Sequence, residues 1–192
     1  MISERVQSLS KVQSAENFAK ERHINAVRID PNISHHEHLS SVVARLKNLG
    51  VTDQDVLCAA WLHDTINDTE TSFDELDKRF DSKVAVLVLS ISRDRTLSRS
   101  VQEEQYVKQL RGAPIEAKLI KLCDISANLR DLKNSQWSKT RKTKEVKKKL
   151  YYLNVIKSDL VKNKDQVPGI TSLINGINDT ITSYGLRPVV FQ

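Results

Sequence analysis

Cysteine, glycine and proline are all scarce in this sequence of 192 residues. The only cysteines, Cys58 and Cys123, form no CxxC pair and no disulfide framework, so a reducing compartment suits the chain best. Five glycines and four prolines are too few for a fold of many short strands and tight turns. Helix-favouring Lys, Glu, Leu, Ala and Gln fill the stretches between them. Composition therefore predicts an all-α protein.

Long apolar runs are missing as well. The longest, from Val84 to Leu89, is far too short to span a bilayer. Residues 1–22 are polar and charged, unlike the apolar segment of a secretory signal. We therefore expect a cytoplasmic protein with no membrane partner.

The charge of the chain is positive, at a formal +6, with a pI near 9.3. A positive field suits an anionic partner, either a phosphorylated small molecule or a nucleic acid. The basic residues concentrate in segment 139–149. No aromatic ladder or glycine-rich RNA-binding motif accompanies that segment, which favours a solvated helix face over a nucleic-acid surface. We therefore expect an anionic nucleotide as the partner and no nucleic acid.

Apolar spacing and helix-end signals predict about eight or nine helices joined by short connections, which form an irregular bundle. A valine-rich stretch at 81–92 has strand propensity, but we expect a buried helix because no partner strand is visible elsewhere. Thr52 and Asp55 resemble a capping box, and Thr71 opens a helix in the same way. We expect one domain over residues 1–165, with a C-terminal helix and tail, 166–192, packed on it. The expected helices cover about residues 4–27, a segment ending at Gly50, 53–68, a short segment after Thr71, 81–92, 114–132, 138–163 and 168–184.

One polar stripe lies at the end of a strongly apolar segment. On a continuous helix, His63, Asp64, Asn67 and Asp68 occupy positions i, i+1, i+4 and i+5 and share one sector. Imidazole and carboxylate groups at the end of a core helix are costly unless something compensates for their burial. A divalent metal is one compensation, and a helix end that reaches solvent is the other.

A second stripe interrupts the apolar helix predicted around residues 117–132. Asp124, Asn128 and Asp131 share one face at spacings of four and three residues. Asp124 lies deep in apolar sequence, where an unpaired carboxylate is expensive. Either a metal or a salt bridge to a lysine satisfies this requirement.

Three histidines in four residues, His35, His36 and His38, precede another amphipathic helix. Any one of them can supply a further imidazole to the two stripes. Two histidines and two aspartates make a mixed nitrogen and oxygen site suited to Mn²⁺, Fe²⁺ or another divalent ion. Such a site lacks the thiolates of structural zinc centres and leaves positions open for water and substrate.

These residues resemble the H…HD…D signature of the HD phosphohydrolases, carried here by His38, His63-Asp64 and Asp124. Longer blocks are similar to the hydrolase domain of the RelA/SpoT group and cover about residues 20–160. They are Val51 to Thr69, Phe80 to Thr96 and Ala117 to Leu132. The chain as a whole resembles a stand-alone small alarmone hydrolase with a single HD domain.

The resemblance implies removal of the 3′-diphosphate of guanosine 3′,5′-bis(diphosphate), usually with Mn²⁺. It selects His38 among the three histidines, because the distance from His38 to the apolar positions of its helix fits the family's first motif. It also implies that Arg28, Asn128 and Arg141 contact the substrate. For the two arginines, an ordinary surface cation is the alternative.

Two positions depart from the family pattern. Asn67 stands where the family carries glutamate, and Ile29 stands where it commonly carries lysine. An amide can position a water but cannot take its proton at neutral pH, so either Asp68 serves alone as the base or the reaction is slow. Two alternatives stay open: an HD phosphohydrolase acting on another nucleotide or on a dinucleotide-cofactor phosphate, and a non-catalytic metal- or nucleotide-binding protein.

Overall fold

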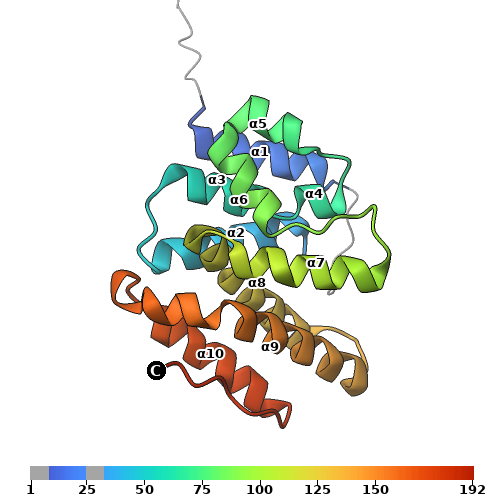
Figure 1. Ribbon diagram of the computed structural model, residues 1–192, viewed down its shortest axis with the longest axis vertical. Helices are drawn as coiled ribbons and strands as arrows, with labels where there is room; N and C mark the ends of the chain where they lie inside the picture. Colours follow the sequence, from blue (N-terminus) through green and yellow to red (C-terminus); the bar gives the residue numbers. More distant parts are fainter. Residues whose placement is uncertain (1–8, 25–32) are drawn as a thin grey trace, which may run out of the picture.

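The computed structural model describes residues 9–24 and 33–192, and all regular structure in those ranges is helical (Figure 1). The expected all-α irregular bundle is therefore confirmed. The elements are α1 Lys11–Arg22, α2 His35–Asn48, α3 Gln54–Leu62, α4 Thr65–Asp68, α5 Phe73–Phe80, α6 Ser82–Ser90, α7 Arg99–Gly112, α8 Ile115–Asn134, α9 Lys139–Lys162, the 3₁₀ turn η1 Lys164–Gln166 and α10 Ile170–Ser183.

Helix α8 forms the centre of the bundle. Fourteen of its twenty residues are buried, nine of them apolar and five polar or charged. It packs against the earlier helices α2, α3 and α6 on one side and against the later helices α9 and α10 on the other (Figure 1). The polar stripe of α8 therefore lies inside the molecule, where its carboxylates need partners.

The N-terminal helices form a second group around α3. Helix α3 has seven buried residues out of nine and contacts α1, α2, α6 and α8. Helix α6 is the valine-rich segment, and its burial against α3 and α8 confirms the helix predicted there. At the other end, α10 contributes four buried isoleucines to the same hydrophobic core and packs on α8. The division into residues 1–165 and 166–192 stays a prediction.

Several helix starts differ from the predicted ones. Of the helix predicted over residues 4–27, the structure describes α1 from Lys11, where the Ser10 side chain accepts a hydrogen bond from the Gln13 amide, and residues 4–8 and 25–27 lie outside the described residues. Asp53, not Thr52, caps α3, and Ser72, not Thr71, caps α5. Asp53 and Ser72 each lie one position after the predicted capping residue. Their side-chain oxygens accept hydrogen bonds from amides in the first turn of α3 and α5.

The continuous helix predicted for 53–68 is wrong, because the chain divides into α3 and α4 at His63-Asp64. The Thr65 hydroxyl donates to the Leu62 carbonyl at 2.6 Å, and His63 Nδ1 donates to the Ala60 carbonyl at 2.8 Å. The two side chains thus donate to backbone carbonyls at the end of α3. In a continuous helix, those carbonyls would accept from backbone amides instead. His63 and Asp64 consequently project from a turn.

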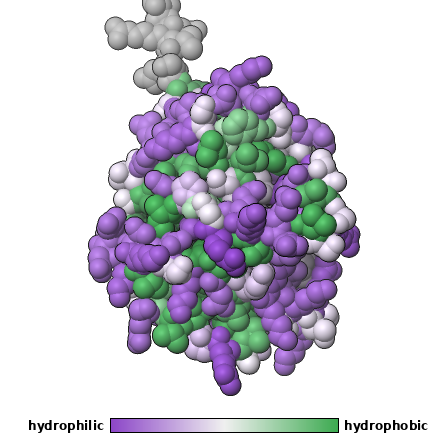
Figure 2. Space-filling view, viewed as in Figure 1, coloured by the Kyte–Doolittle hydropathy of each residue, from purple (hydrophilic) through white to green (hydrophobic). Residues whose placement is uncertain are grey.

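The surface is largely polar. Figure 2 shows hydrophilic residues over most of the visible face, with hydrophobic residues in separate patches between them. Within the described residues, none of the helices combines the length and the apolar character needed to cross a membrane.

Candidate metal and phosphate site

Side chains from α2, the α3–α4 turn and α8 converge on one point. His38 Nε2 lies 3.4 Å from Asp124 Oδ1 and 3.8 Å from Asp64 Oδ2. His63 Nε2 lies 3.3 Å from Asp64 Oδ2 and 3.7 Å from Asp124 Oδ1. The ligand atoms of His38, His63 and Asp124 all fall within 4.8 Å of one another. The structure thus brings together the four residues predicted as metal ligands.

Hydrogen-bonding groups behind the cluster fix its two imidazoles. The Ala60 carbonyl accepts from His63 Nδ1, and a carboxylate oxygen of Asp131 lies 3.5 Å from His38 Nδ1. Both Nε2 atoms are therefore directed at the carboxylates. His63 Nε2 is buried and makes no hydrogen bond among the residues described. Such second contacts orient the ligating nitrogens of histidines in metal sites.

The ionisation of the cluster favours a cation. Burial acts to raise the pKa values of Asp64 and Asp124, yet neighbouring histidines and lysines hold both well below the ordinary range. Burial acts to lower the pKa of His63, but these two carboxylates raise it to about 10. The pocket thus stabilises positive charge at His63 Nε2. Two imidazole nitrogens and two carboxylates fit a divalent ion, whose binding requires that His63 lose its proton.

Asp124 also forms a salt bridge with a lysine, which was the alternative to a metal at this position. Lys121 Nζ donates to Asp124 Oδ2 at 2.9 Å, and the other oxygen, Oδ1, faces the histidines. Asn128 Nδ2 donates both to the Asp124 carbonyl, at 3.0 Å, and to Oδ1. The lysine and the amide therefore orient the carboxylate while one oxygen stays toward the cluster.

A polar cavity of about 350 Å³ opens beside the cluster. Its wall includes cationic side chains from three parts of the chain: Arg93, Arg95, Lys121 and Lys149. Lys149 lies in the basic segment that was predicted to be a solvated face, and most of that segment is indeed exposed. Burial near the cluster lowers the pKa of Lys149 to about 8. A cavity with cations and a carboxylate cluster at its base is suited to a phosphorylated ligand.

The two residues predicted to be catalytic line the same cavity. Asn67 Oδ1 accepts a hydrogen bond of 2.8 Å from the Arg93 amide and so holds the loop that carries the arginines. The side chain of Asp68 is 42% exposed, and its Oδ2 lies 3.2 Å from His35 Nε2. Asp68 thus keeps access to water, whereas Asn67 has a structural contact that sequence reasoning did not foresee.

The predicted substrate contacts are placed less uniformly. Asn128 lines the cavity. Arg141 is exposed, with its guanidinium 3.5 Å from the centre of the Trp137 ring, and it does not line the cavity. Arg28 and Ile29 lie outside the described residues.

Sequence reasoning missed Arg93, Arg95 and Lys149 as cavity residues. The only sequence signal for Lys149 was its position in a basic segment. Its exposed neighbours share that signal, so it could not be distinguished from them. His35 was considered only as an alternative to His38, but it lies in a separate group with His23 and Asp68.

Comparisons with known proteins agree with this geometry. The model of the HD domain family matches residues 15–153. The guanosine-3′,5′-bis(diphosphate) 3′-pyrophosphohydrolase MESH1 of Danio rerio is 40% identical over 118 residues, which are 60% of this chain and 66% of that protein. The Homo sapiens MESH1 is 37% identical over 137 residues, which are 69% of this chain and 76% of that protein.

A solved structure of a metazoan ortholog of SpoT, described as hydrolyzing ppGpp, has a TM-score of 0.75 with this fold. It is 26% identical, and the match covers 93% of this chain and 97% of that one. The match therefore extends over nearly the whole of both chains. The chain belongs to the HD domain family, alongside the MESH1 proteins.

Proposed function

We propose that this protein hydrolyses guanosine 3′,5′-bis(diphosphate) to GDP and pyrophosphate in the cytoplasm, with Mn²⁺ as its metal. The observation that carries the proposal is the meeting of His38, His63, Asp64 and Asp124 at the base of a cationic cavity. The MESH1 relatives supply the identity of the substrate.

The four residues of the cluster would hold the ion through two imidazole nitrogens and two carboxylates. A divalent ion in such a site polarises a phosphoryl oxygen and makes water more acidic. Lys121 favours the ionised form of Asp124, and the hydrogen bonds from Lys121 and Asn128 orient its carboxylate. Asp131 holds the ring of His38 from behind.

The remaining side chains act on the substrate and on water. Arg93, Arg95 and Lys149 lie where they neutralise the charge of a diphosphate, which increases as the phosphoryl bond breaks. Asp68 accepts the proton of the attacking water, using the carboxylate oxygen that does not face His35. As the water oxygen bonds to phosphorus, the bond from phosphorus to the 3′ oxygen breaks, and that oxygen takes a proton from solvent to become the 3′ hydroxyl of GDP. Asn67 positions that water while it holds the Arg93 loop.

Nucleoside contacts complete the proposal. Asn128 borders the cavity. Arg141 lies eight residues before Lys149 on α9, a rise of about 12 Å along the helix. We assign Arg141 and Arg28 to the part of the nucleotide beyond the diphosphate.

The test is product analysis with purified protein, Mn²⁺ and a panel of nucleotides. GDP and pyrophosphate from guanosine 3′,5′-bis(diphosphate) are the expected products. His63→Ala removes a ligand and should abolish turnover, whereas His36→Gln, on the Glu16 and Trp61 side of α2, should not. Orthophosphate released from a dinucleotide cofactor, with no reaction of the guanosine compound, would refute the substrate assignment. Binding of nucleotide without any product would refute catalysis.

A further inference from the structure

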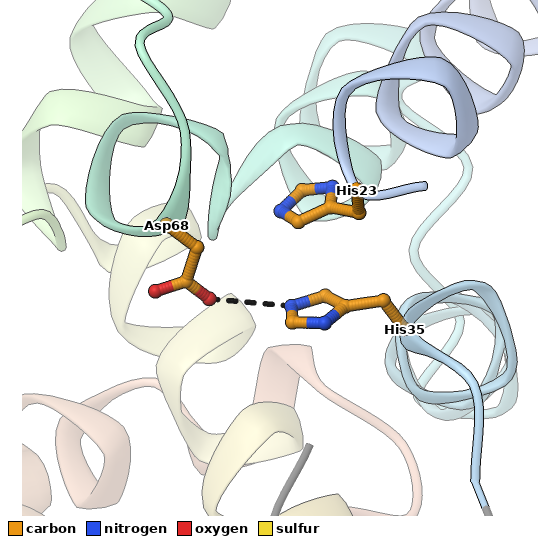
Figure 3. A group of neighbouring side chains, drawn as sticks. All are labelled: His23, His35 and Asp68. Carbon is orange, nitrogen blue, oxygen red and sulfur yellow. Dashed lines mark ion pairs between the residues drawn. The ribbon is translucent and has the colours of Figure 1, made fainter. Parts of the chain in front are cut away.

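A second group of metal-ligand side chains lies beside the first and consists of His23, His35 and Asp68 (Figure 3). Each offers one ligand atom, and these three atoms lie within 4.8 Å of one another. In Figure 3 both imidazoles point toward Asp68 from the same side. The group joins the end of α1, the first residue of α2 and the last residue of α4.

His23 is held with one nitrogen available. It follows α1, is 4% exposed, and its Nδ1 donates to the Ala19 carbonyl at 2.8 Å. Its Nε2 is buried and makes no hydrogen bond in the described part of the chain. Burial is the largest influence on the pKa of His23 and lowers it, which favours the neutral ring. Because Nδ1 donates to the Ala19 carbonyl, the lone pair of that neutral ring lies on Nε2. A neutral imidazole with one nitrogen fixed by a carbonyl is the usual state of a histidine ligand.

His35 is aligned with that ring. The two imidazoles stack with centroids 4.2 Å apart and an angle of 12° between their planes. His35 is 6% exposed, and within the described residues neither of its nitrogens makes a hydrogen bond. The Ser34 capping box fixes the first turn of α2, which presents His35 and His38 three residues apart on one side. Within the described residues, the buried nitrogens of His35 make no hydrogen bond, and its Nε2 has only ionic contacts, the shorter one of 3.2 Å with Asp68 Oδ2, so a compensating partner is expected.

Asp64 connects the two groups. Its Oδ2 lies 3.3 Å from His63 Nε2 and 3.8 Å from His35 Nε2. One carboxylate oxygen therefore lies between the proposed metal ligands and the stacked pair. Paired divalent ions about 3.5–4 Å apart act together in many enzymes that cleave phosphate esters.

We infer that His23, His35 and Asp68 form a second divalent-metal site, with Asp64 as the carboxylate between the two ions. Imidazole and carboxylate ligands suit first-row ions such as Mn²⁺, Co²⁺ and Zn²⁺. The site lies at the edge where Asp68 meets solvent, so its ion would face an incoming phosphate. The other explanation for the contact between His35 and Asp68 is an ion pair with a protonated imidazole.

Metal content of the full-length protein tests the inference independently of any turnover. The chelator-treated protein is loaded with excess Mn²⁺, passed through a desalting column and analysed by mass spectrometry of the metal. We expect two equivalents per chain in the wild type and one in His35→Gln and in His23→Gln. The matched control His36→Gln changes the neighbouring histidine, which contacts Glu16 and Trp61 instead, and should retain two.

Electron paramagnetic resonance of the loaded wild type needs no variant, so it remains decisive if the glutamine variants fail to fold. We expect the spectrum of two exchange-coupled Mn²⁺ ions, replaced in His35→Gln by that of an isolated ion. A single equivalent with an uncoupled spectrum in the wild type would mean that His35 and Asp68 form only an ion pair, and it would overturn the inference. Hydrolysis supported by that single ion would leave the proposed function intact, whereas two bound ions without hydrolysis would refute only the proposed function.

Discussion

Replacement of Asn67 by glutamate tests how this chain manages without the second carboxylate of its family pattern. Asn67 Oδ1 accepts from the Arg93 amide at 2.8 Å, and a glutamate oxygen can accept the same hydrogen bond. The cavity of about 350 Å³ beside it accommodates the added methylene. The nearby Arg93 and Arg95 partly offset the repulsion between the new charge and Asp68.

The expected result of Asn67→Glu is an increase in kcat. A positioned general base contributes about 10²–10⁴-fold, and Asp68 already supplies part of that effect. We therefore expect about a tenfold gain, equivalent to about 1.4 kcal/mol in the activation free energy. The assay is turnover of guanosine 3′,5′-bis(diphosphate) at saturating Mn²⁺ between pH 6 and 9, with the product GDP measured by chromatography.

Asn67→Gln is the matched control, because it adds the same methylene without the charge. If glutamate acts as a base, the glutamine variant should not share the gain. Equal increases in both variants would attribute the effect to side-chain length and refute the reasoning. A fall in activity with glutamate alone would indicate that Asn67 adapts the cavity to a different phosphate substrate.

Further predictions concern the metal, the base and the cations. His63→Ala should abolish binding at the proposed primary metal site with an unchanged circular dichroism spectrum, and retained metal there would contradict the ligand assignment. Asp131→Asn, behind His38, should weaken Mn²⁺ affinity about 10–100-fold in calorimetric titration. Asp68→Asn should reduce kcat about 10²-fold or more, and wild-type turnover in this variant would exclude Asp68 as the base. Lys149, with a pKa of about 8, is cationic below that pH and loses its charge above it, so kcat/KM should fall as pH rises through about 8. Lys149→Gln should lower kcat/KM below pH 8 and flatten that dependence, and an unchanged profile would show that Lys149 does not contact substrate.

Much of this site was readable from the sequence because helices repeat every 3.6 residues. That period places Asp124 and Asp131 on one face of α8, and both carboxylates do face His38. His63 and Asp64 were predicted as site residues from the sequence, because polar groups at the end of an apolar segment are costly to bury without a partner. The choice of His38 came from family resemblance, because residue chemistry alone left three histidines equivalent.

Only the tertiary structure decided which of these groups meet. His38 of α2, the α3–α4 turn and the polar stripe of α8 converge because α2, α3 and α8 pack on one another, and spacing along the chain carries no information about that packing. The break between α3 and α4 depends on side-chain hydrogen bonds to the Ala60 and Leu62 carbonyls, which compete with continuation of the helix. Lys149 has the same charge as its exposed neighbours, and it differs only in facing α8 and the cluster. His35 and His38 are three residues apart in sequence, yet packing against different partners assigns them to separate groups.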